Sequence, residues 1–104
     1  SGTLNKPQST GTGEDELLMA AAELFKAGKI LEGRQQLMQY IAMYPSRLED
    51  VYRWFYDNLE LWSRDQDVQD RAIMIIRQGC VNHSFVTDPE INLSATLAEL
   101  AALR

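Results

Sequence analysis

Cysteine and histidine are almost missing from this chain. Its 104 residues include one Cys, Cys80, and one His, His83. A single cysteine cannot form a disulfide within the chain, and the first residues carry no secretory signal, so we expect a reducing, cytoplasmic environment. Zinc sites use several His or Cys ligands, and a nucleophile needs a partner base. We therefore predict no metal site and no catalytic residues.

Positive charge and long apolar runs are also scarce. The chain contains ten Lys and Arg residues and fifteen Asp and Glu residues, which gives a net charge of −5 and a pI of about 4.7. A surface for nucleic acid or an anionic membrane needs clustered basic residues, and here they are dispersed. No apolar run approaches the roughly 20 residues that span a bilayer. A Walker A loop, G-x-x-x-x-G-K-[ST], is absent, so this segment is predicted to be no enzyme and to hold no cofactor.

What the chain does contain is enough apolar sequence for one core. It is 45% hydrophobic and 24% charged, as expected of a single globular domain. Residues 1–13 are rich in Gly, Ser and Thr and are predicted to be a flexible linker or a non-native tail. The folded domain is expected over residues 14–104.

The periodicity of that domain is helical throughout. We expect helices over 14–27, 30–44, 46–62, 63–84 and 89–104. Capping boxes are predicted at S-R-L-E (46–49), S-R-D-Q (63–66) and T-D-P-E (87–90). Short connections favour antiparallel neighbours. The predicted fold is an all-α, single compact five-helix domain, arranged as an antiparallel helix bundle.

Three of these helices have more apolar surface than one small core needs. A second apolar pair, spaced by one heptad, stands beside the main stripe on the third helix and on the fourth. The last helix is apolar nearly all round, with a narrow polar strip of Asn92, Thr96 and Glu99. We interpret the surplus as an interaction surface. The candidate subunit contacts are Trp54, Leu61, Met74, Val81, Leu93, Leu100 and Leu103.

The chemically capable side chains have simpler structural interpretations. Clustered carboxylates at 14–16, 49–50 and 65–67 lie near helix starts, where capping and dipole contacts are expected. His83 and Cys80 fall on the main face of the fourth helix and are predicted to be core residues. A small acid–base catalyst using His83 stays open only if a pocket beside it is lined by two or more carboxylates.

Three stretches resemble a known family. They are Y-R-W-F-Y-D-N-L (52–59), A-I-M-I-I-R-Q-G (72–79) and N-H-S-F-V-T-D-P-E-I-N-L-S-A-T-L-A-E-L-A (82–101). Together they are similar to the C-terminal collar domain of the small ATPase subunit of phage-type sliding-clamp loaders, which is related to replication factor C small subunits. The matching features are Trp54-Phe55, the isoleucines at 73, 75 and 76, and Glu90 ahead of a Leu/Ala-rich helix. The resemblance covers residues 14–104.

The resemblance implies an oligomerisation domain that acts in DNA replication, in the cytoplasm of an infected bacterium. Family collars pack into a ring with copies of themselves and other clamp-loader subunits. ATP, Mg²⁺, the sliding clamp and primer–template DNA are handled by AAA+ modules that this segment lacks. The alternative is a free-standing helical adaptor that binds a partner helix in a groove and has no replication role.

Overall fold

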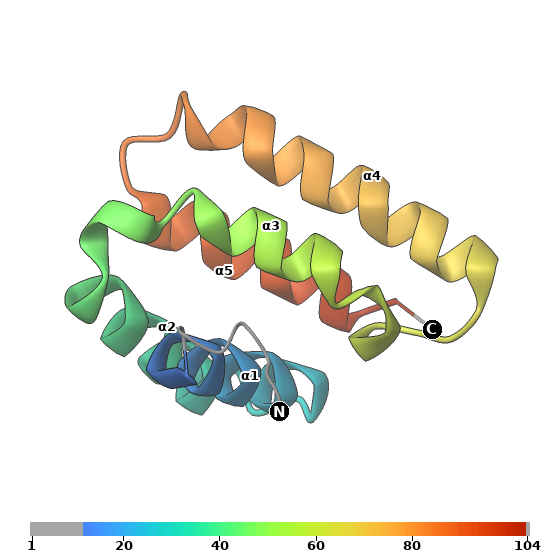
Figure 1. Cartoon of the computed structure of the whole chain (residues 1–104), viewed down its shortest axis with the longest axis horizontal. Helices are drawn as coiled ribbons and strands as arrows, with labels where there is room; N and C mark the ends of the chain where they lie inside the picture. The colour runs from blue at the N-terminus through green and yellow to red at the C-terminus, as the bar shows by residue number, and fades with distance from the viewer. Residues whose placement is uncertain (1–11, 104) are drawn as a thin grey trace, which may run out of the picture.

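The structure, a computed structural model, describes residues 12–103 and confirms the all-α prediction. Those residues form five α-helices and two short 3₁₀ helices (Figure 1). The predicted linker, residues 1–13, lies outside the described part except for Thr12 and Gly13, which belong to the first helix. In chain order the elements are α1 (Thr12–Lys26), α2 (Ile30–Met43), η2 (Pro45–Arg47), α3 (Asp50–Asp57), η3 (Leu59–Leu61), α4 (Gln66–His83) and α5 (Pro89–Ala101).

The α1–α2 hairpin turns at a left-handed glycine. Gly28 has a φ of +82°, a conformation that glycine adopts without steric cost. Its N–H donates to Phe25 O at 3.1 Å, and Lys29 N donates to Leu24 O at 2.8 Å. These two bonds form a Schellman motif, which satisfies the last carbonyl groups of α1 and reverses the chain.

The predicted third helix, 46–62, is broken into three pieces. No side-chain cap opens α3 at Glu49, so the capping box predicted at 46–49 is wrong. At the other end, Asn58 donates from Nδ2 to the carbonyl oxygen of Trp54 at 2.8 Å. That side chain replaces the next backbone bond of the helix, and the chain continues as η3.

The starts of α4 and α5 are capped by aspartates, not by the predicted Ser and Thr. Asp65 accepts from the N–H groups of Asp67 and Val68 at 2.8 and 3.4 Å. Asp88 accepts from Glu90 N at 3.0 Å, with Pro89 as the first helical residue. α5 therefore begins at its predicted start and α4 begins three residues after its own, and an aspartate side chain caps each of them.

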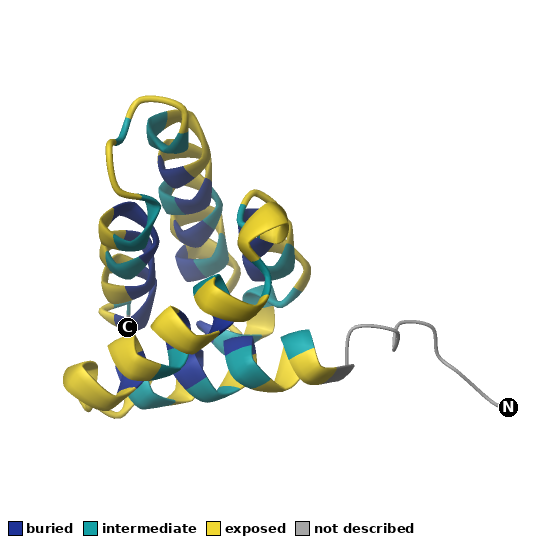
Figure 2. Cartoon of the chain, turned by 90° about the vertical axis from the view of Figure 1, so that its left-hand side faces the viewer, coloured by how far each residue is buried: buried dark blue, intermediate teal, exposed yellow. Residues whose placement is uncertain are grey.

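The helices form two crossed groups. α4 runs antiparallel to α3 and α5 (Figure 1), whereas the α1–α2 hairpin crosses these three at a steep angle (Figure 2). Both α1 and α2 pack against α5. As a result α5 carries the centre of the core, where Leu93, Leu97 and Leu100 are each 0% exposed.

Candidate functional site

The outward side of α4 carries an exposed apolar row. Met74 and Val81 are 53% and 51% exposed, which is the surface position their heptad spacing predicts. Phe85 follows four residues after Val81 and is 82% exposed. It was not among the predicted contacts, and it lies in the turn just after α4, which ends at His83. We call Met74, Val81 and Phe85 the α4 row.

A second exposed row runs along α5. It consists of Ile91, Ala95, Ala98 and Ala102, spaced by four, three and four residues, and all are exposed. Ile91 is the largest of them and is 67% exposed. Figure 2 shows the exposed sides of α4 and α5 turned away from the core. Because Phe85 and Ile91 flank the same turn, the two rows meet at residues 84–91, which we call the hairpin tip.

The predicted contacts on α5 need correction. Leu93 and Leu100 are 0% exposed, so they cannot contact another subunit in this fold. Leu103 is partly buried against the same core. The prediction failed because α5 is covered by α1 and α2 on one side and by α4 on another. The surplus apolar surface of this helix is therefore used mainly within the domain.

Two of the three residues of the polar strip on α5 point inward, whereas the third, Glu99, is exposed. Asn92 and Thr96 are 7% and 2% exposed. Asn92 Nδ2 donates to Gly79 O at 2.9 Å and to the Tyr52 hydroxyl oxygen at 2.8 Å, while Thr96 Oγ1 donates to Asn92 O at 2.9 Å. This buried network joins α3, α4 and α5, and it supplies the partners that buried polar groups require.

His83 completes that network. Its Nδ1 lies 2.8 Å from the Tyr52 hydroxyl oxygen. Both N–H groups of the Asn92 amide are used as donors, one of them to the Tyr52 hydroxyl oxygen. The direction of the hydrogen bond between that hydroxyl and His83 Nδ1 is set by the imidazole tautomer. Burial is the main cause that raises the pKa of Tyr52 to about 12, partly offset by the Asn92 hydrogen bond. The arrangement gives His83 a structural role as a hydrogen-bond partner of Tyr52.

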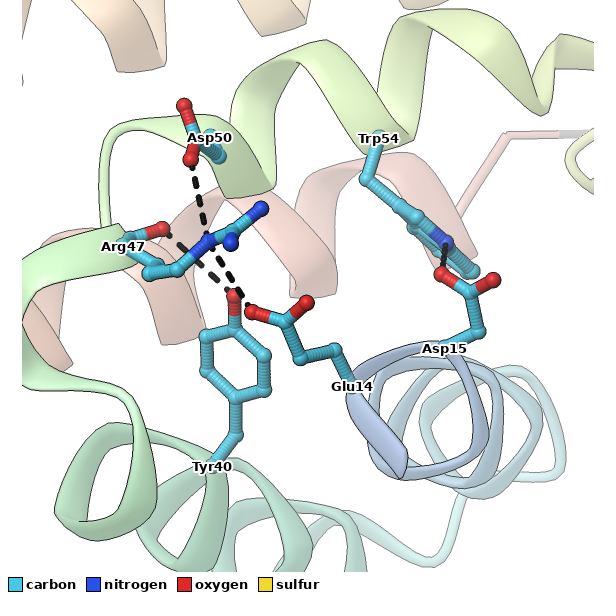
Figure 3. Close-up of polar contacts among 6 residues, drawn as sticks. All are labelled: Glu14, Asp15, Tyr40, Arg47, Asp50 and Trp54. Carbon is cyan, nitrogen blue, oxygen red and sulfur yellow. Dashed lines mark hydrogen bonds and ion pairs between the residues drawn. The ribbon is translucent and has the colours of Figure 1, made fainter. Parts of the chain in front are cut away.

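Trp54 and Leu61 hold elements together within the domain. Trp54 is half-buried, packs edge-on against Phe55 with ring centroids 6.1 Å apart, and donates from Nε1 to Asp15 Oδ1 at 3.2 Å (Figure 3). Leu61 is partly buried against the core, and its carbonyl accepts from Lys26 Nζ at 2.6 Å. Both residues thus tie α3 and η3 to α1. The prediction that Trp54 and Leu61 form a surface pair on one continuous helix is wrong, because α3 ends at Asp57.

The N-terminal carboxylates belong to a small charged cluster. Arg47 Nε lies 3.0 Å from Glu14 Oε2 and 3.2 Å from Asp50 Oδ2 (Figure 3). Glu14 Oε2 has no partner in hydrogen-bond geometry, so its link to Arg47 is a charge contact. Tyr40 donates its hydroxyl to Arg47 O at 3.4 Å. Burial, and then the Glu14 carboxylate, raises the pKa of Tyr40 to about 12. The cluster fastens the start of α1 to the chain around η2.

An open groove lies between α3 and α4. Its volume is about 370 Å³, and its apolar lining comes from Tyr52, Tyr56, Ile73 and Ile76, with Glu49, Arg53, Arg77 and Cys80 beside them. Cys80 is exposed, which corrects its prediction as a core residue. Burial raises the pKa of its thiol, with a smaller contribution from Glu49. This groove is lined by one carboxylate and not by His83, so it lacks the acid–base arrangement sought beside that histidine.

The described residues also bear on metal binding and on membrane crossing. Residues 12–103 contain no group of three His, Cys, Asp or Glu side chains placed to hold a metal ion. Within the same residues, no helix combines the length and apolar character needed to cross a membrane. No protein-family model, curated protein or solved structure matches the chain. The apolar rows on α4 and α5 and the α3–α4 groove are therefore the features from which a function can be argued.

Proposed function

We propose that this domain is the oligomerisation collar of a sliding-clamp loader subunit in DNA replication. The observation that carries the proposal is the exposed apolar row formed by Met74 and Val81 on α4 and by Phe85 just after it. Met74, Val81 and Phe85 stay more than half exposed, although burial of such side chains stabilises by about 1.5–3 kcal/mol each. The family resemblance supplies the partner, which is the collar of the next subunit.

The proposed mechanism is scaffolding. A collar that joins subunits holds the attached ATPase modules at a high effective concentration for one another. The domain itself then needs no nucleotide site. Its net charge of −5 fits a part of the machine that leaves primer–template DNA to other modules.

Under this proposal, the exposure of each predicted contact decides which of them remain candidates. Met74 and Val81 remain surface candidates. Trp54 and Leu61 are partly buried against the core, so serine at either position is expected to destabilise the fold before it affects any partner. Phe85 and Ile91 take the place of Leu93 and Leu100 as candidate contacts, because they are the exposed large residues at the hairpin tip.

The test uses the natural full-length gene product together with its partner subunit. The proposal predicts an ATPase module with a Walker A loop ahead of residue 14. The double variant Met74→Ser/Val81→Ser should weaken ring assembly, measured by light scattering, because it removes two exposed apolar contacts. Leu31→Ser/Met38→Ser is the matched control. It changes an exposed pair with the same heptad spacing on α2, where the two residues are 64% and 47% exposed.

Two results would contradict the proposal. One is a full-length reading frame without any ATPase module, which would favour the free-standing adaptor. The other is equal ring assembly by the α4 and α2 double variants when both retain the helical circular dichroism of the parent.

A further inference from the structure

We draw no further inference here: the strongest candidate, the exposed row of Ile91, Ala95, Ala98 and Ala102 along the outer side of α5, is a stripe of mostly small residues, and nothing in the structure shows what covers it.

Discussion

The two helical hairpins, α1–α2 and α4–α5, each have a glycine at the contact between their helices, but the side chains that pack against the glycine differ. In α1–α2, a Cβ added at Gly33 would stand 2.6 Å from the ring of Phe25, so the contact is apolar. In α4–α5, a Cβ added at Gly79 would stand 2.6 Å from Thr96 Oγ1 and 3.0 Å from the ring of Tyr52. The second contact contains the Asn92 network, in which each polar group must stay opposite its partner. Close packing joins the first pair of helices, and specific hydrogen bonds fix the register of the second.

The largest expected effect on stability comes from adding a methyl group at Gly79 or at Gly33. Gly79→Ala should lower the free energy of unfolding by about 2–4 kcal/mol, because the methyl group displaces Thr96 and Tyr52 together. Gly33→Ala should cost about 1–2 kcal/mol, because only the Phe25 ring must move and alanine favours the helix. Urea unfolding followed by circular dichroism measures both. Equal losses would mean that the polar network adds nothing to the α4–α5 contact.

The next effect isolates the network itself. Asn92→Leu keeps the side-chain size but leaves Gly79 O and the Tyr52 hydroxyl without their donor. A loss of about 1–3 kcal/mol is expected, because two buried hydrogen bonds are removed. Ser94→Leu is the control and should change stability less. Ser94 lies two residues after Asn92 on α5 and is partly buried. A stable Asn92→Leu protein would show that apolar packing alone fixes this hairpin.

The sequence was informative about helix existence but weak on helix orientation. Gly28, Pro45 and Pro89 mark chain reversals through their own backbone preferences, so the five helices follow from local chemistry. The inward side of α5 could not be predicted, because apolar residues nearly encircle it and define no single face. Leu93 and Leu100 were therefore placed outside. The break after Asp57 also depends on one side chain, Asn58, whose bond to Trp54 O competes with the helix.

The residues of the candidate surface also divide into those that the sequence could predict and those that it could not. Met74 and Val81 were predictable, because α4 has a clear buried stripe and these residues oppose it. Asn92 and Thr96 were identified only as part of a polar strip, with no partner assigned to them. The partners of Asn92 are Tyr52 and Gly79, which lie on other helices. The groove beside α4 also exists only once α3 and α4 are packed, so no spacing within either helix could have indicated it.

A smaller effect concerns the link between the α1–α2 hairpin and the remaining helices. Arg47 contacts Glu14, whose side chain is 14% exposed, and Asp50, whose side chain is 65% exposed. Arg47→Met should cost about 0.5–1 kcal/mol and lose part of that cost in high salt. Arg53→Met is the control, since Arg53 pairs only with Asp57 on the same helix among the described residues, and it should stay within about 0.5 kcal/mol. Equal effects would show that the cluster around Arg47 is no more than a surface pair.

The last expectation is a pH effect that is absent near neutrality and compares one tyrosine from each group of helices. Tyr40 in α2 and Tyr52 in α3 both have a pKa raised to about 12, chiefly by burial. In the unfolded chain a tyrosine ionises near its ordinary pKa of about 10. Above that pH the unfolded state loses protons that the folded state keeps, so stability is full below pH 10 and falls as pH rises toward 12. Stability measured by urea unfolding should therefore be flat around neutral pH and decline above pH 10. Tyr52→Phe should remove part of the decline, and Tyr56→Phe, which changes a ring that is 44% exposed, should keep all of it. Should the two variants decline equally, burial of the Tyr52 hydroxyl would not be holding its proton, and the comparison between the buried Tyr52 and the exposed Tyr56 would fail.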